Sequence, residues 1–467
     1  MTTTMTIKVK IKIAVFILLA LVVGACVTNN SNTPVTTGGP SPSPVNTPVS
    51  NAPENAKPHS GVTLAVLDAL LANDKFVSEL KSKLQITDEQ IETLRKASAD
   101  EVNRLRSNNA EDTTVESADA RSRATEQINR ILGEEKATQF NGFVSEFWAR
   151  GGEGEPSDKQ AENSLPKTPN SIPTDTRIVV NIPSYRMDLF KNGSLVKTYK
   201  IGIGYPEFPL PQGLRKAQTI IFNPTWTPPD SPWVAKMKNV TPGEKIEAGS
   251  KLNPLGPIKI PIGMPSLIHG GKSQAKLGTF ASHGCVGLTT PQVKDFAMML
   301  GEISDSQVSE KSIAAHLKDP TQTQTVKLKQ SVPVELRYET IVLEDGKLHI
   351  FKDVYDQGTN TEDNLRAVLE ANGSRLEDLT EEDRSQILAA LNAMSAHPKA
   401  MPSPSTSNAK DTQTQKRKVN EKKGGRNQKE VVVELKSLAG RGYPAPVNYD
   451  TGSGKSTLTA AVTQKTR

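Results

Sequence analysis

Ser282-His283-Gly284-Cys285-Val286-Gly287-Leu288 is the stretch of sequence that decides the fold of this chain, and Leu267-Ile268-His269-Gly270 lies shortly before it. The chain has two cysteines, and the other, Cys26, closes a short apolar run near the N-terminus that reads as an export signal. Cys285 therefore has no partner for a disulfide within the exported chain. A single thiol flanked by histidines in such a protein indicates chemistry rather than cross-linking.

The residues around Cys285 predict a nucleophilic site. An acylating thiol needs a nearby imidazole to take its proton. His283 would share a face with Cys285 in an extended strand, whereas His269 ends a predicted strand that could be its neighbour. Ser282 to Gly284 supply consecutive backbone N–H groups, and Gly284 lets the backbone approach a substrate, which suits an oxyanion hole.

Two other interpretations of these residues stay open. A buried cysteine beside hydrogen-bonded histidines is common in protein cores, although the combination here exceeds what packing requires. Zinc bound by His269, His283 and Cys285 is the other, but neither a paired metal motif nor a carboxylate to orient the histidines accompanies them. We therefore expect neither a metal nor an organic cofactor.

The N-terminus predicts export and anchoring. Three lysines precede an uncharged run from Ile13 to Val23, which is too short to span a bilayer comfortably. Val23-Gly24-Ala25-Cys26 resembles the lipobox of bacterial lipoproteins, and this resemblance implies cleavage before Cys26 and lipidation of its sulfur. An ordinary signal peptide is the alternative. Val27 stands where a retention aspartate would favour the inner membrane. In a cell with two membranes, the resemblance therefore implies the outer membrane as the destination of this periplasmic, lipid-anchored protein.

Composition divides the chain into folded parts and linkers. With 32 Pro, 32 Gly and 35% hydrophobic residues, much of its length is expected to be linker. The net charge of +6 is modest, and the densest basic run, Lys416 to Arg426, has no aromatic residues for stacking on bases. A solvated linker, or one that contacts anionic envelope polymers or lipid headgroups, is expected there, and nucleic acid is not an expected partner.

Periodicity sets the predicted boundaries. Residues 61–150 have helical spacing, with a capping box at Thr87 and Gln90, and are expected to act as a spacer or as a docking surface for envelope proteins. The fold class is multidomain α+β. The predicted segments are a lipoprotein signal peptide at 1–26, a disordered tether at 27–60, a helical bundle at 61–150, a linker at 151–173, a mostly β catalytic domain at 174–356, a helical appendage at 357–397 and a mostly disordered basic tail at 398–467 that offers one short strand.

Strand signals dominate residues 174–356. Ile178 to Ile182 leads into Met187 to Phe190, and Asn192-Gly193 supplies the left-handed dihedral angles of a tight hairpin. One helix interrupts the strands, with Thr290 as its predicted cap. Further strands are predicted at 195–203, 219–222, 258–260, 267–269, 332–338 and 341–351, the last split by an Asp345-Gly346 turn.

The segment around Cys285 resembles a known family. Ile268-His269-Gly270, followed by the residues from Leu277 to Val286, is similar to the L,D-transpeptidases, the cysteine enzymes of the bacterial cell wall that share the YkuD-type β-sandwich fold. Gly202-Ile203-Gly204, Asn223 to Pro229 and Asn253-Pro254-Leu255-Gly256 look like the segments that precede the active site in Gram-negative-type members. The resemblance covers about residues 175–355.

This resemblance implies a reaction and roles for residues. Cys285 would attack the amide after the third residue of a tetrapeptide stem of peptidoglycan, releasing D-alanine and leaving a thioester. His269 would be the base, oriented by a backbone carbonyl near Gly270, and the amides of His283, Gly284 and Cys285 would hold the oxyanion. A diamino acid side chain would then accept the acyl group in a 3-3 crosslink, whereas water would give carboxypeptidase activity and a lipoprotein lysine would give protein anchoring.

One position departs from the family. Ser282 and Gly287 are expected to border the substrate, but the family usually places arginine or asparagine where this chain has Gly287. A glycine cannot pair with a substrate carboxylate, so Arg215 or Lys216 would have to substitute from another loop. A catalytically impaired peptidoglycan-binding scaffold is therefore a competing prediction.

Overall fold

The computed structural model describes residues 62–107, 117–149, 168–229, 234, 237–263, 265–395 and 428–453. The predicted signal peptide, Cys26 and the tether at 27–60 lie outside these residues. Within the described ranges no helix is both long enough and apolar enough to cross a bilayer.

A helical section precedes the sheet. Thr63 caps its first helix by accepting a hydrogen bond from the Val66 amide at 3.3 Å. The predicted capping box is confirmed, because Thr87 and Gln90 exchange hydrogen bonds of 3.1 and 3.2 Å. Phe76 and Phe147 pack edge to face in the core of this section. Its helices are α1 (Leu64–Leu71), α2 (Asp74–Leu84), α3 (Asp88–Ser107), α4 (Ser117–Leu132) and α5 (Glu134–Ala149).

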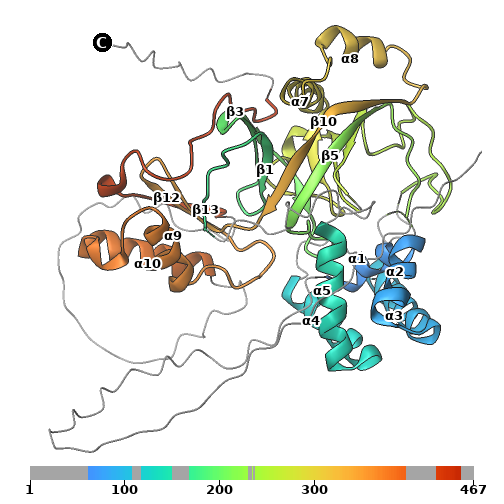
Figure 1. Cartoon of the computed structure of the whole chain (residues 1–467), viewed down its shortest axis with the longest axis horizontal. Helices are drawn as coiled ribbons and strands as arrows, with labels where there is room; N and C mark the ends of the chain where they lie inside the picture. The colour runs from blue at the N-terminus through green and yellow to red at the C-terminus, as the bar shows by residue number, and fades with distance from the viewer. Residues whose placement is uncertain are drawn as a thin grey trace, which may run out of the picture. The chain divides into compact units, whose positions relative to one another are not determined.

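An eight-stranded sheet forms the centre of the segment predicted to be mostly β, and Figure 1 shows β1, β10 and β5 side by side within it. Its order is β3-β2-β1-β10-β5-β6-β7-β9, in which β1 pairs with β10, and β7 with β9, in parallel. The mostly β character expected of this segment is confirmed. Its strands are β1 (Arg177–Asn181), β2 (Arg186–Lys191), β3 (Ser194–Lys200), β5 (Gly213–Phe222), β6 (Ile258–Pro261), β7 (Leu267–Lys272), β9 (Val286–Thr289) and β10 (Gln324–Arg337).

Short elements complete this segment. β4 (Ile203–Gly204) and β8 (Phe280–Ser282) form a separate two-stranded parallel sheet, and η1 (Gln274–Lys276) is a single 3₁₀ turn. α7 (Thr290–Ile303) follows β9 and packs its apolar stripe into the main core, and α8 (Glu310–His316) follows it.

Local turn chemistry explains two of these boundaries. Asn192 and Gly193 have φ values of 49° and 79°, so the predicted hairpin between β2 and β3 is confirmed. The predicted cap of α7 is off by one residue. Thr289, not Thr290, is the N-cap, since its extended backbone lets its hydroxyl accept from the Gln292 amide while the Gln292 side chain reaches back.

A second, smaller sheet lies after the central one. β11 (Ile341–Glu344), β12 (Lys347–Phe351) and β13 (Glu430–Glu434) are paired in that order, with a tight turn at Asp345-Gly346, as predicted. α9 (Glu362–Ala371), η2 (Leu376–Asp378) and α10 (Glu381–Ser395) share one apolar core with these strands. The predicted domain boundary at residue 356 therefore cuts through a single folded unit.

The C-terminal segment requires another correction. Residues 428–453 were expected to belong to a mostly disordered tail, but they form β13, η3 (Lys436–Leu438) and a segment that docks on β3. The Thr198 amide donates to the Val447 carbonyl at 2.9 Å, and the Lys200 amide donates to the Asp450 carbonyl at 2.9 Å. These backbone bonds extend the edge of the central sheet, so this part of the chain is tied down by partners that are far away in sequence.

Candidate active site

Three adjacent strands place the predicted site residues in one row. His269 on β7 is paired with Lys259 on β6 and with Gly287 on β9. Ile268 and Val286 are also paired, and both are fully buried in the main core. Because side chains alternate along a strand, His269 and Cys285, the residues next to that core pair, face the other side of the sheet. The structure therefore brings His269 and Cys285 to one face, as predicted.

The His269 ring is held in one orientation. Its Nδ1 lies 2.7 Å from the carbonyl oxygen of Gly270, so Nδ1–H donates to that oxygen and Nε2 carries the lone pair. The side chain is 3% exposed. The orientation by a backbone carbonyl at Gly270 agrees with the expectation. The ring makes no hydrogen bond to the Cys285 sulfur within the described structure, a common situation for catalytic pairs without substrate.

Ser282 shapes the turn that presents the thiol. Its Oγ accepts from the Cys285 amide at 2.9 Å and donates to the Cys285 carbonyl at 2.5 Å. Gly284 lies between them with φ at 94°, a left-handed value that a side chain would strain. In this structure the Cys285 amide therefore donates to the Ser282 hydroxyl, and the expected role of that amide in an oxyanion hole stays a prediction. Ser282 itself is 3% exposed and holds the loop.

Electrostatics keep both partners neutral at rest. Burial raises the pKa of the Cys285 thiol, against the opposing effects of the Leu267 N–H and the charges of Lys272 and Lys259. Burial, followed by the charge of Lys272, lowers the pKa of His269 to about 3. The resting site is therefore a thiol beside a neutral imidazole, in which the ring is ready to accept a proton when the sulfur attacks.

His283 occupies a different environment from His269. Its ring packs between Tyr205 and Phe208, with centroid distances of 5.2 and 4.9 Å. Burial, and then the charge of Lys272, hold the pKa of His283 well below its usual value. Among the described residues, no three His, Cys, Asp or Glu side chains converge on a point where they could hold a metal ion. The structure thus separates the two histidines that the sequence left as alternatives.

The two cations suggested as substitutes at Gly287 lie elsewhere. Arg215 is 1% exposed and is paired with Val334 on β10. β5 pairs with β6 only from Ile221, six residues further along, which is about 20 Å at 3.3 Å per residue. Lys216 is exposed next to Arg215. The side chain that approaches Gly287 is instead Lys272, because a Cβ at position 287 would lie 2.8 Å from its Cγ.

The loop between β5 and β6 covers the histidine. Trp226, Val234 and Leu255 form a small apolar cluster of their own, which Leu267 at the start of β7 joins. The backbone of Leu255 also acts on the His269 ring, in the direction that raises its pKa. The sequence did not predict that this loop covers His269, although Pro254-Leu255-Gly256 is the part of it that could have indicated this.

The helical section contacts the loop that holds His283. Tyr205 and Phe208 pack with Ala65 of α1 and Leu105 of α3 in a buried cluster. Glu207, between those two aromatics, is 2% exposed, and its backbone carbonyl accepts from the Thr63 hydroxyl at 2.8 Å. The helices are therefore connected to the active-site loop by both packing and hydrogen bonding.

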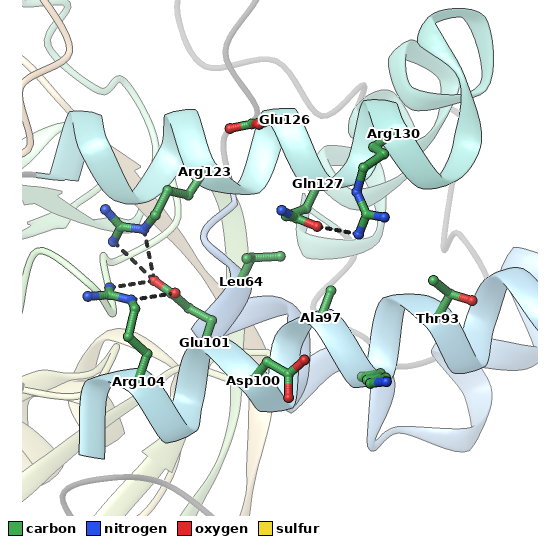
Figure 2. A pocket seen from close by; sticks show the side chains of 11 residues that line it. Leu64, Thr93, Ala97, Asp100, Glu101, Arg104, Arg123, Glu126, Gln127 and Arg130 are labelled. Carbon is green, nitrogen blue, oxygen red and sulfur yellow. Dashed lines mark hydrogen bonds and ion pairs between the residues drawn. The ribbon is translucent and has the colours of Figure 1, made fainter. Parts of the chain in front are cut away.

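A cavity of about 610 Å³ lies between α3 and α4, with Leu64 of α1 in its lining. Figure 2 shows Glu101 held by Arg104 and Arg123 at one end of this cavity. The shortest distances in these two pairs are 2.7 and 3.0 Å. Glu101 is thus paired with two of the arginines that line the cavity, and none of the lining residues lies on β6, β7 or β9.

Comparison with known proteins identifies the segment that contains this row. Residues 175–309 match the family model of the L,D-transpeptidase catalytic domain, YkuD. A comparison with curated protein sequences finds no match.

Solved structures are also similar to part of the chain. The catalytic domain of the Enterococcus faecium L,D-transpeptidase is 18% identical, and the match covers 36% of this chain and 100% of that one, with a TM-score of 0.23. An L,D-transpeptidase from Mycobacterium smegmatis is 14% identical over 35% of this chain and 58% of that one, with a TM-score of 0.21. L,D-transpeptidase 3 from Mycobacterium tuberculosis is 15% identical over 35% of this chain and 60% of that one, with a TM-score of 0.21.

The chain spans about half of the longer matching structures, at 49% and 50% of two of them. The assignment is based on the family model and not on these low structural scores. Residues 175–309 are similar to the YkuD family of L,D-transpeptidase catalytic domains.

Proposed function

We propose that this protein is a peptidoglycan L,D-transpeptidase that forms a thioester on Cys285 from a tetrapeptide stem. The acyl group is then transferred to an amine, either of a neighbouring stem in a 3-3 crosslink or of a lipoprotein. Water as the acceptor gives carboxypeptidase activity. The proposal is supported by the family match over residues 175–309 and by the chemistry of the residues that this segment places on one face of the sheet.

The proposed mechanism assigns each step to a residue of this segment. The Cys285 sulfur attacks the carbonyl carbon of the third residue while Nε2 of His269 takes the thiol proton. The Gly270 carbonyl, 2.7 Å from Nδ1, stabilises the imidazolium that forms. The backbone amides of His283 and Gly284 are the proposed donors to the oxyanion. The C–N bond then breaks, and the imidazolium returns its proton to the departing amine of D-alanine.

The observation that carries this proposal is the parallel pairing of β7 with β9. It pairs His269 with Gly287, two residues after Cys285, so the proposed base lies on β7 and the proposed nucleophile directly precedes the neighbouring strand β9. Gly287 is also the observation that favours the second candidate, a catalytically impaired peptidoglycan-binding scaffold, because a glycine offers no side chain to the substrate.

Mass spectrometry of the intact chain after mixing with a tetrapeptide stem or a carbapenem tests the choice. An acyl adduct on Cys285 that is absent in Cys285→Ala and greatly slowed in His269→Ala is the expected result. His316→Ala is the matched control, since His316 stacks on Phe222 and bonds Gln324. Binding without any adduct would favour the scaffold instead.

We place the protein in the periplasm, lipid-anchored at Cys26 and bound to the outer rather than the inner membrane. The support is the sequence from Val23 to Cys26 followed by Val27. Envelope proteins that contact the helical regions are further proposed partners. Metabolic labelling with a radioactive fatty acid should mark the wild-type protein and leave Cys26→Ala unlabelled, whereas equal labelling of both would contradict the anchor.

A further inference from the structure

The stem of Lys272 crosses the space that the missing side chain of Gly287 leaves open. Lys272 is the last residue of β7 and is paired with Thr289 after a register shift from His269. A Cβ at position 287 would lie 2.8 Å from Cγ of Lys272 and 3.1 Å from its Cε. Contacts below 3.0 Å are not tolerated, so the lysine can follow this course because residue 287 is a glycine.

The charge carried by this stem acts on the reactive groups. The positive charge of Lys272 influences the Cys285 thiol and both the His269 and His283 rings. Lys259, directly opposite His269 on β6, also acts on Cys285. The two lysines therefore lie on separate strands, β6 and β7, and the charge of each acts on the thiol.

Neither ammonium group has a carboxylate partner among the described residues. Lys259 makes one long hydrogen bond, 3.5 Å to the Thr225 carbonyl, and Lys272 has no hydrogen bond or ion pair there. Both are partly buried, and burial lowers both pKa values. Partly burying two cations without a nearby anion has a cost in free energy, and a bound anionic ligand would offset that cost.

We propose that Lys272, assisted by Lys259, forms a subsite for the C-terminal carboxylate of the donor peptide, beside Cys285. This inference rests on the proposed function and specifies how the donor is recognised. The amide that Cys285 attacks lies one residue from the end of a tetrapeptide, so the terminal carboxylate must enter the site close to the sulfur. A charge-assisted contact to an ammonium group is the strong way to hold it there.

The same contact has a consequence for the product. When the sulfur–carbon bond forms and the C–N bond breaks, the released D-alanine keeps its carboxylate. The amino acid therefore stays paired with Lys272 until it dissociates, and the acceptor amine enters only afterwards. Free D-alanine is expected to inhibit the first step competitively through the same subsite.

Binding to the full chain with Cys285→Ala tests the subsite without turnover. Titration calorimetry compares a tetrapeptide that has a free C-terminal carboxylate with the same peptide as its C-terminal amide. We expect the amide to bind about 30-fold more weakly, which is the scale of a lost charge-assisted contact. Adding Lys272→Met should reduce this preference to less than about threefold, and Lys272→Arg should preserve most of it. Lys294→Met, on the exposed side of α7, is the matched control and should keep the full preference.

A second variant tests the geometry without removing a charge. Gly287→Ala should push the Lys272 stem aside and lower the preference for the carboxylate, while Lys272 remains present. With Cys285 intact, D-alanine should inhibit acylation of the wild type and have little effect on Lys272→Met.

The outcomes separate this inference from the function on which it rests. If a carbapenem acylates Cys285 but acid and amide peptides bind equally, the subsite is wrong and the proposed enzyme stands. If the acid peptide is preferred through Lys272 and Cys285 is never acylated, the subsite stands and the enzyme fails. Equal loss of preference in Lys294→Met and Lys272→Met would show a general charge effect and overturn the subsite.

Discussion

Replacing Glu207 with glutamine should stabilise the contact between the helical section and the active-site loop above neutral pH, and leave it almost unchanged near pH 5. Burial raises the pKa of Glu207 to about 7, against the charges of Arg123 and Arg104. Its Oε1 lies 3.4 Å from Arg123, while Oε2 is buried without a hydrogen-bond partner. Glu101 and Asp119 add negative charge nearby.

The sign follows from proton binding. Between pH 4.5, the ordinary pKa, and about 7, the folded chain keeps a proton on Glu207 that the unfolded chain has released. Stability therefore falls as the pH rises through this window, and the full cost is present above it. At about 1.4 kcal/mol per pKa unit, the difference amounts to about 3 kcal/mol. Little of this is screened by solvent, since the residue is 2% exposed.

Hydrogen exchange of the α3 and α4 amides in the full chain, corrected for intrinsic rates, measures the local opening free energy at pH 5 and pH 8. Glu207→Gln should raise this opening free energy at pH 8 by an amount approaching 3 kcal/mol and should change it little at pH 5. Glu244→Gln, at an exposed carboxylate, is the control. A variant that is destabilised equally at both pH values would refute the reasoning, because the loss would then come from packing and not from charge.

Three further predictions concern the site and the C-terminal segment. The rate of alkylation of Cys285 by iodoacetamide should rise about tenfold per pH unit from pH 6 to 9 without a plateau, because the pKa of the thiol is raised and His269 stays neutral throughout. A plateau below pH 7 would indicate a preformed thiolate. Ser282→Ala should slow carbapenem acylation about tenfold with a small change in melting temperature, because it removes both hydrogen bonds that hold the turn; unchanged acylation would show that the turn holds without them. Val433→Ala should lower the free energy of unfolding in urea by about 2 kcal/mol, whereas Val432→Ala should have almost no effect, since the two side chains are 6% and 48% exposed. Equal effects of the two substitutions would mean that β13 is not part of the core.

Signals that span a few residues were sufficient for the local elements. Asn192-Gly193 predicted its hairpin and Thr87 with Gln90 predicted its cap, because the required dihedral angles and hydrogen bonds lie within four residues. The α7 cap was missed by one residue, since two threonines stood side by side and the end of β9 decided which of them was extended.

The candidate nucleophile and base could be found from the sequence, because thiol and imidazole chemistry depends on residue type. The residues alone left His269 and His283 as alternatives, and the family resemblance favoured His269. The pairing of β7 with β9 and the aromatic rings around His283 supply the physical difference between the two histidines.

The sequence by itself determined that Cys285 is set in a glycine-containing turn with histidines in reach, and that β signals surround it. Tertiary structure alone decided that the charges of Lys259 and Lys272 act on the Cys285 thiol and that Gly287 leaves room for a lysine stem. It also decided that β13 completes a sheet with strands some 80 residues earlier. The physical reason is the distance along the chain over which each effect acts. Dihedral preferences and side-chain chemistry act within a few residues, whereas strand pairing and burial depend on segments that meet only when the chain has folded.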